Sequence, residues 1–213
     1  MAELDLFQAK FYAILDTGYV SPADWKQKAL ALMEGGADLL QVRAKKESRQ
    51  QRRTLAESVY PLCEDAKIPL IINDDLDLAL SLPNAGLHLG QDDLPIEKAR
   101  EVLGPDRILG LSTHSLDQAQ AALSRQHLLN YFAVGPVFPT ATKPDYIPVG
   151  LKLVRDVANL NPSLPWFCIG GISPGNVKEV KSAGGRRIVV VSAVLLSGDT
   201  SGSVAEYKQI FAV

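Results

Sequence analysis

The run GPVFPTATK combines turn-forming residues, two hydroxyl groups and one cation in a short loop that follows an apolar, strand-like segment. Gly135 allows a ligand to approach the backbone closely. Thr140 and Thr142 offer hydroxyl donors, and Lys143 offers a mobile positive charge that suits phosphate. The run therefore predicts an anion site, although a plain proline-rich connection between a strand and a helix would carry the same turn residues.

A second group of cations follows another apolar segment, in the run QVRAK. Alternation along an extended chain puts Gln41, Arg43 and Lys45 on the same side. Arg43 can bind a phosphate group through two parallel hydrogen bonds, and Lys45 adds a point charge. A solvated charge run is the alternative, but the end of a buried strand is a poor place for a solvated arginine.

Carboxylates follow the next two apolar segments, in the runs NDD and HLGQDD. Two carboxylates from neighbouring strand ends, together with a diphosphate, commonly hold Mg²⁺, and Asp74 and Asp93 are the predicted pair. His88 lies inside its segment and is interpreted as a buried, hydrogen-bonded histidine. The remaining acids are interpreted as helix caps or first-turn acids; these are Asp75, Asp77 and Asp92.

Three further segments end in polar or glycine-containing turns. In the run GLSTHS, Ser112 is positioned to meet a substrate, and Ser115 is a predicted helix cap. His114 is either an acid–base candidate or a capping or surface residue. The runs IGGI, with Gly171, and VVSA, with Ser192, resemble the phosphate site at the last two strands of a barrel. Two anion sites suit an enzyme that joins one phosphorylated substrate to another that loses diphosphate.

These residues need a scaffold that brings strand ends together, and the chain alternates strand-like with helix-like segments. Such alternation predicts a parallel sheet. The expected strands are Phe11–Asp16, Asp38–Arg43, Pro69–Asn73, Gly86–Leu89, Ile108–Ser112, Tyr131–Val134, Trp166–Ile169 and Arg187–Val191. The expected helices are Asp24–Glu34, Ser48–Ala66, Pro95–Leu103, Ser115–Leu123, Gly150–Ala158 and Ser173–Ala183.

Eight strand–helix units in 213 residues predict an α/β fold, a (β/α)8 TIM barrel with short loops that occupies residues 1–213 as a single domain. A doubly wound open sheet is the alternative. The net charge of −2 gives no basic surface for nucleic acid. Cys63 and Cys168 lack metal-ligand spacing and are expected to be buried free thiols. No apolar run nears the roughly 18 residues of a membrane span, and no signal peptide is recognised, so we expect a cytoplasmic protein.

The runs QVRAK, IINDDLDLAL, GLHLGQDDL, GLSTHS, GPVFPTATK, IGGI and VVSA, in this order, resemble the thiamine-phosphate synthase family over essentially the whole chain. The resemblance implies a transferase that joins 4-amino-5-hydroxymethyl-2-methylpyrimidine diphosphate to hydroxyethylthiazole phosphate, with Mg²⁺ and with release of diphosphate. Its partners would be these small molecules, and a homo-oligomer stays open.

The resemblance also implies roles for individual residues. The run from Gln41 to Lys45, which includes Val42 and Ala44, would hold the pyrimidine diphosphate together with Asn73. Asp74 and Asp93 would bind Mg²⁺, and Ser112, Arg43 and Lys143 would act on the pyrimidine substrate and its departing diphosphate. The thiazole phosphate would meet the residues Thr140, Ala141, Thr142, Gly171, Val191 and Ser192.

The chain departs from the family pattern at a few positions and leaves two rival functions open. Ala44 stands where the family usually has an acid, Asp75 where it more often has a basic or bulky residue, and Arg186 and Arg187 where it has smaller ones. A thiazole tautomerase of the same superfamily would use His114 as a proton shuttle, but such enzymes typically lack the acid pair and the Thr-x-Thr-Lys loop. A non-catalytic barrel that binds thiamine precursors is the other alternative.

Overall fold

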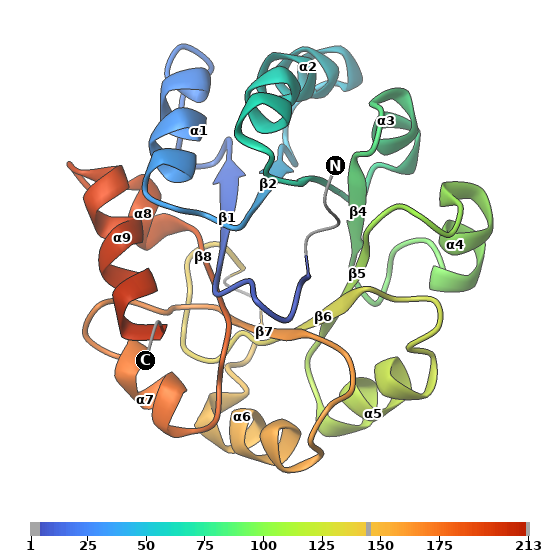
Figure 1. The fold of residues 1–213 in the computed structure, drawn as a ribbon, viewed down its shortest axis with the longest axis vertical. Helices are drawn as coiled ribbons and strands as arrows, with labels where there is room; N and C mark the ends of the chain where they lie inside the picture. Colours follow the sequence, from blue (N-terminus) through green and yellow to red (C-terminus); the bar gives the residue numbers. More distant parts are fainter. Residues whose placement is uncertain (1–4, 144–145, 212–213) are drawn as a thin grey trace.

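A closed barrel of eight parallel strands forms the centre of the protein in the computed structural model, which describes residues 5–143 and 146–211 (Figure 1). Each strand pairs with the next along the chain, and β8 closes the barrel against β1. Helices alternate with the strands and surround the barrel. The (β/α)8 prediction is confirmed, and the alternative of an open sheet is wrong.

The observed strands begin and end within one residue of the expected positions, because strongly apolar runs bounded by turn residues define them. The strands are β1 (Phe11–Asp16), β2 (Leu39–Arg43), β3 (Leu70–Asn73), β4 (Gly86–Leu89), β5 (Leu109–Thr113), β6 (Tyr131–Val134), β7 (Trp166–Ile169) and β8 (Ile188–Val190). The helices are α1 (Trp25–Glu34), α2 (Arg49–Ala66), α3 (Leu76–Ser81), α4 (Ile96–Leu103), α5 (Leu116–Ser124), α6 (Gly150–Asn159), α7 (Val177–Ser182), α8 (Ser192–Leu195) and α9 (Thr200–Phe211).

Three helices were given no range from the sequence, namely α3, α8 and α9. The first two have six and four residues, too few for a helical period to be recognised. Helix α9 contains Gly202 and several hydroxyl residues, which lower its intrinsic helix propensity. It forms because Val204, Tyr207 and Phe211 are buried against the barrel, so packing outweighs propensity.

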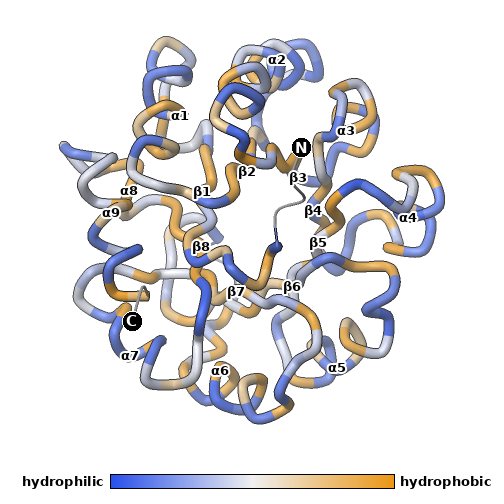
Figure 2. Tube along the Cα trace, in the orientation of Figure 1, coloured by the Kyte–Doolittle hydropathy of each residue, from blue (hydrophilic) through white to orange (hydrophobic). Residues whose placement is uncertain are grey.

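Two hydrophobic cores follow from the alternation of side chains along the strands. The larger core lies between the strands and the surrounding helices and includes Leu40 and Val42 of β2. The smaller core fills the barrel and includes Leu39 of the same strand. Figure 2 shows hydrophilic segments mainly on the outer turns of the helices. Polar side chains inside the barrel are therefore exceptions that need their own explanation.

The N-terminal segment is anchored in the interior of the barrel. Leu6 and Ala9 belong to the inner core. The Arg187 guanidinium donates hydrogen bonds to the backbone oxygens of Leu6, at 3.2 Å, and Phe7, at 2.8 Å. Arg187, a departure from the family pattern, thus holds this segment beneath the strands, at the end of the barrel where β1 begins.

Candidate active site

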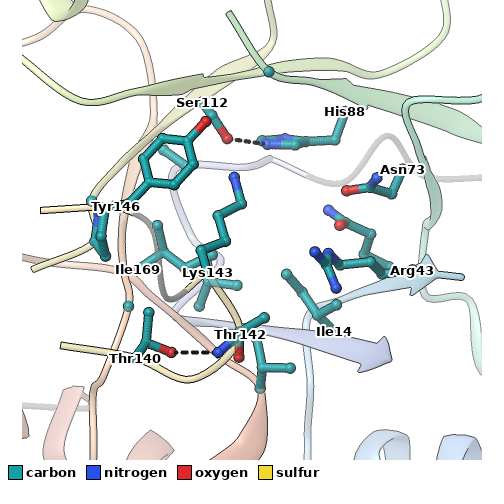
Figure 3. Close-up of a pocket in the computed structure, with 18 of the residues that line it drawn as sticks. Ile14, Arg43, Asn73, His88, Ser112, Thr140, Thr142, Lys143, Tyr146 and Ile169 are labelled. Atoms are coloured by element: carbon teal, nitrogen blue, oxygen red, sulfur yellow. Dashed lines mark hydrogen bonds between the residues drawn. The ribbon is translucent and has the colours of Figure 1, made fainter. Parts of the chain in front are cut away.

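A cavity of about 520 Å³ opens at the carboxyl end of the barrel. Every strand contributes at least one residue to its wall. The volume lies in the range of about 300–1,000 Å³ that is typical of small-molecule sites. Figure 3 shows side chains from several strands and from the loop after β6 converging on this space. The location is the one at which barrels of this kind carry active sites.

Arg43 reaches the cavity from the end of β2 and is held by a carboxylate that the sequence analysis missed. Its Nη1 donates to Asp16 Oδ2 at 2.5 Å, and the Asp16 side chain is only 3% exposed. Asp16 also accepts a hydrogen bond from the backbone of Gly18 at 2.8 Å. The pair fixes the guanidinium while its other donors remain available to a ligand. Asp16 ends β1, so its position at a strand end was the signal that could have found it.

The predicted metal ligands Asp74 and Asp93 both line the cavity. Asp74 forms an ion pair with Lys45, and Asp93 Oδ2 accepts the backbone N–H of Gly90 at 2.7 Å. Burial raises the pKa of Asp93, and the adjacent carboxyl group of Asp74 raises it further. Two crowded carboxylates beside a lysine make a site where a cation would relieve repulsion.

The other acids of these segments have separate roles. Asp75 caps α3, because its Oδ1 accepts the backbone N–H of Leu78 at 3.0 Å, and its other oxygen lies 3.4 Å from Arg52. Asp77 lies in the first turn of α3. Both interpretations are confirmed, and the extra charge of Asp75 is matched by Arg52. The cap interpretation of Asp92 is wrong, because Asp92 lies in the turn before α4 and lines the cavity.

The loop after β6 places Lys143 inside the cavity, with its ammonium group directed toward Ser112 and His88 (Figure 3). Burial lowers the pKa of Lys143, and the charge of Arg43 lowers it further. Two hydrogen bonds stabilise the loop. The Thr142 backbone N–H donates to Thr140 Oγ1 at 3.3 Å, and Thr142 Oγ1 lies 2.8 Å from the Tyr19 hydroxyl.

Tyr146 covers this part of the cavity and was not found from the sequence. The Lys143 ammonium lies 5.0 Å from the centre of its ring, and the ring of His114 lies 4.8 Å away on another side. His114 Nδ1 lies 2.5 Å from the backbone oxygen of Gly135 and therefore carries the proton. In the neutral ring, Nε2 then has the lone pair. Burial lowers the pKa of His114. The aromatic ring supplies an apolar wall next to two basic groups.

The turn after β7 lies against the loop after β6. Gly171 has a φ of +62°, and a Cβ at this position would lie 2.5 Å from the backbone oxygen of Pro139. Only glycine adopts this positive φ readily and also leaves room for the Pro139 oxygen. Asn176 holds the turn, since its side chain donates to the Gly171 oxygen at 2.9 Å and accepts from the Ser173 backbone at 2.8 Å. Ser192 begins α8 and lines the same side of the cavity.

His88 and Ser112 face each other across the inner wall. His88 Nε2 lies 2.8 Å from Ser112 Oγ, and His88 Nδ1 lies 2.9 Å from the Tyr131 hydroxyl. Burial lowers the pKa of His88 to about 3, and the charge of Lys143 adds to this effect. The prediction of a buried, hydrogen-bonded histidine is confirmed. Ser115 is the N-cap of α5, as expected.

Most of the residues named from the sequence are thus brought to one cavity, although their roles remain predictions. Those that line it are Gln41, Arg43, Lys45, Asn73, Asp74, Asp93, Ser112, Thr140, Thr142, Lys143, Gly171, Val191 and Ser192. Val42, Ala44 and Ala141 do not line it. The first two belong to the outer core, because alternation along β2 turns their side chains toward the helices. Through those side chains they cannot reach a ligand in the cavity.

Comparisons with known proteins identify the family of this chain. The model of the family described as thiamine monophosphate synthase matches residues 11–194. Thiamine-phosphate synthase of Acidothermus cellulolyticus is 41% identical over 177 residues, covering 83% of each chain. That of Nitrosococcus oceani is 39% identical, covering 94% of this chain and 91% of the relative. A Synechococcus relative is 43% identical, but the match spans only 47% of its length.

A solved structure of the same family has the same fold as this chain. Thiamine phosphate pyrophosphorylase from Pyrococcus furiosus superposes with a TM-score of 0.83 at 30% identity, covering 95% of both chains. A 3-hexulose-6-phosphate synthase, at 14% identity and a TM-score of 0.66, shares the fold alone. Within the described residues, no helix has the length and apolar character to cross a membrane. The family model and the two relatives matched over most of their length agree with the resemblance in the motifs, and this chain belongs to the thiamine-phosphate synthase family of transferases.

Proposed function

We propose that this protein forms thiamine phosphate from 4-amino-5-hydroxymethyl-2-methylpyrimidine diphosphate and hydroxyethylthiazole phosphate, with release of diphosphate. Family membership and the names of the relatives support this reaction. The observation that carries the proposal is the convergence of three carboxylates and three cations in one cavity. A diphosphate substrate needs this combination, because it carries several negative charges that must be matched before a bond to it breaks.

The pyrimidine diphosphate is assigned to the side of the cavity formed by β2 and β3. Arg43 and Lys45 would bind its phosphate oxygens, and Gln41 and Asn73 would hydrogen-bond the remaining polar atoms. Val42 and Ala44 can contribute only through their backbone, since their side chains lie in the outer core. The Asp16 carboxylate would keep Arg43 oriented while the substrate binds.

The donor set fits a magnesium ion that is shared with the substrate. Among the residues that the structure describes, no three His, Cys, Asp or Glu side chains come together as a metal centre. Mg²⁺ does not need such a cage, because it is usually bound by one or two carboxylates, phosphate oxygens and water. Asp74 and Asp93 would supply the carboxylates. When bound, the ion would offset the charge of the leaving diphosphate.

The residue types suit a reaction that begins with bond cleavage. The C–O bond between the pyrimidine methylene and the diphosphate breaks, and both electrons leave with the diphosphate. The thiazole nitrogen then forms a C–N bond to the resulting cation. No proton has to be removed, so no general base is needed. Lys143 would stabilise the departing diphosphate, and the Tyr146 ring would help to exclude water from the cation.

The thiazole phosphate is assigned to the opposite side of the cavity. Thr140 and Thr142, with the backbone of Ala141, would lie next to the thiazole. The backbone near Gly171, Val191 and Ser192 would receive its phosphate. These segments belong to different loops, and the close approach of Gly171 to Pro139 joins them. A site built from two loops in contact can bring the thiazole nitrogen next to the pyrimidine methylene.

The direct test is thiamine phosphate formation from the two purified substrates, with Mg²⁺ and with EDTA. Product that requires the metal is the expected result. No product from folded protein would contradict the proposal. Interconversion of carboxythiazole phosphate isomers without Mg²⁺ would then indicate the tautomerase and His114, and binding without turnover would indicate the non-catalytic barrel. The cytoplasmic location and any homo-oligomer remain predictions.

A further inference from the structure

A continuous chain of hydrogen bonds crosses the interior of the barrel and ends at the cavity on both sides. It starts at Gln41, whose Nε2 lies 2.5 Å from the Tyr12 hydroxyl. The Tyr12 hydroxyl lies 2.8 Å from that of Tyr131, which lies 2.9 Å from His88 Nδ1. His88 Nε2 lies 2.8 Å from Ser112 Oγ. Gln41 and Ser112 line the cavity, whereas Tyr12 and Tyr131 do not.

The Gln41 amide nitrogen sets which group donates and which accepts along this chain of hydrogen bonds. Gln41 Nε2 can only donate, so the Tyr12 hydroxyl accepts from it. Within residues 5–143 and 146–211, the Tyr12 hydroxyl has hydrogen bonds to Gln41 and Tyr131 alone. Its own hydrogen therefore goes to Tyr131. Tyr131, having accepted one hydrogen bond, donates its hydrogen to His88 Nδ1.

The direction continues through the histidine to the cavity. A neutral imidazole that accepts at Nδ1 carries its hydrogen on Nε2, so Nε2 donates to Ser112 Oγ. The Ser112 hydroxyl has no other partner among the described residues, so its own hydrogen is free for an acceptor in the cavity. At the other end, Gln41 Oε1 accepts no hydrogen bond from the described part of the chain and is available to a donor.

Burial and packing prevent the groups from changing partners. Tyr12, Gln41 and Tyr131 are at most 1% exposed, and His88 is 7% exposed. The Tyr131 ring packs edge-on against Tyr12, with ring centres 5.6 Å apart. A Cβ on Gly110 would lie 2.1 Å from the Tyr131 ring, so the ring fills the space left by that glycine. Each buried polar group in this hydrogen-bond chain is stabilised by keeping the partners it has.

We propose that Tyr12 and Tyr131 are positioning residues that fix Ser112 as a hydrogen-bond donor to an acceptor atom of the substrate and leave Gln41 as an acceptor. This inference rests on the proposed function, because it assigns the ligand of Ser112. A 4-aminopyrimidine offers both complementary features, a ring nitrogen with a lone pair and an amino group that donates. The two hydroxyls act through the chain and do not touch the substrate.

The first test measures the tautomer of His88 in the ligand-free protein and needs no activity. Long-range ¹H–¹⁵N correlation spectra of protein labelled at histidine distinguish a ring nitrogen with a hydrogen from one with a lone pair. The His88→Gln variant assigns the signals. We expect the hydrogen on Nε2 in the wild type and loss of this single tautomer in Tyr131→Phe. A hydrogen on Nδ1 in the wild type would overturn the proposed direction.

The second test measures turnover in a double-mutant cycle. Tyr131→Phe should lower kcat about tenfold, which corresponds to about 1.4 kcal/mol, with little change in either KM. In a Ser112→Ala background, the same substitution should cause no further loss, because Tyr131 acts through His88 and Ser112, whereas Tyr12 also contacts Gln41 directly. Additive losses in a folded protein, or an unchanged kcat in Tyr131→Phe, would overturn the positioning role.

Controls separate this inference from a folding defect and from the proposed function. Tyr207→Phe removes another buried hydroxyl, whose hydrogen bond to the Ile172 oxygen is 3.5 Å long, and should leave kcat and the His88 spectrum unchanged. Thermal unfolding of each variant identifies a structural loss. A wild-type protein that makes no thiamine phosphate but has the expected His88 tautomer would refute the reaction and with it the substrate part of this inference.

Discussion

Replacing Asp16 by asparagine removes the charge that faces Arg43 while keeping the shape of the side chain. The Asp16–Arg43 distance is 2.5 Å, and the side chains are 3% and 15% exposed. Asparagine retains an oxygen that can accept the Gly18 backbone N–H, which lies 2.8 Å from the carboxylate. The substitution therefore leaves the turn after β1 intact and isolates the effect of an unpaired guanidinium.

The magnitude follows from the burial of the two partners. Breaking a fully buried ion pair costs about 3–5 kcal/mol, whereas an exposed pair contributes about 0–1 kcal/mol. Arg43 borders the cavity and can regain some water, so we expect a loss of about 2–3 kcal/mol, below the fully buried value. For a chain of this size that loss corresponds to a decrease in Tm of about 4–12 °C.

The informative assay is thermal unfolding with and without inorganic diphosphate and Mg²⁺. If the diphosphate binds Arg43, it supplies the charge that Asp16 no longer provides, so the difference in Tm between Asp16→Asn and wild type should shrink when the ligand is present. Asp156→Asn is the matched control, because it breaks an exposed pair with Lys152 and should change Tm little in either condition. A difference that the ligand leaves unchanged, in a variant that still binds it, would refute the contact between Arg43 and diphosphate.

Four further predictions concern the metal, the loop and the packing of the barrel. Asp93→Ala should abolish Mg²⁺-dependent turnover without loss of the fold by circular dichroism, and full activity with unchanged metal dependence would remove Asp93 from the site. Lys143→Ala should slow single-turnover chemistry more than it weakens thiazole phosphate binding. Because burial and nearby cations lower the pKa of Lys143, wild-type turnover should fall as pH rises through a value below 10.5, and Lys143→Arg should move that loss to higher pH. Gly110→Ala should lower the free energy of unfolding by about 3 kcal/mol, because its Cβ would lie 2.1 Å from the Tyr131 ring, whereas Gly198→Ala, with open space around it, should be nearly neutral in chemical denaturation.

The fold was predictable because each parallel strand is a short apolar run between turn residues. The run Leu70–Asn73, for example, is apolar up to the polar residue that reaches the cavity. Helix ends were found where a side chain caps them, as at Ser48 and Ser115. The start of α7 was placed too early, because Ser173 and Pro174 form the turn that Asn176 holds, and the helix begins at Val177.

The site was predictable as far as strand ends and loop motifs reveal it. Arg43 ends one apolar run and Asp74 follows another directly, so the fold alone brings them together, whereas the loop after β6 carries Lys143 to the cavity. The sequence does not reveal which charges pair inside the cavity. The contact of Tyr146 with Lys143 depends on the conformation of the loop after β6, and no pattern in the sequence determines that conformation.

The two buried tyrosines that contact the site residues were missed for a different reason. Tyr12 and Tyr131 lie within apolar runs, where an aromatic residue is normally read as part of the core, and both do belong to the inner core. Strand pairing places Tyr131 next to Gly110, two residues before Ser112 on β5. This position brings the Tyr131 hydroxyl close to the polar residues below the cavity. A glycine facing a tyrosine on the next strand is a pattern that alternation can reveal once the pairing of strands is known. The polar end of such a tyrosine then needs a partner inside the barrel, and following that requirement from strand to strand leads to His88 and Ser112.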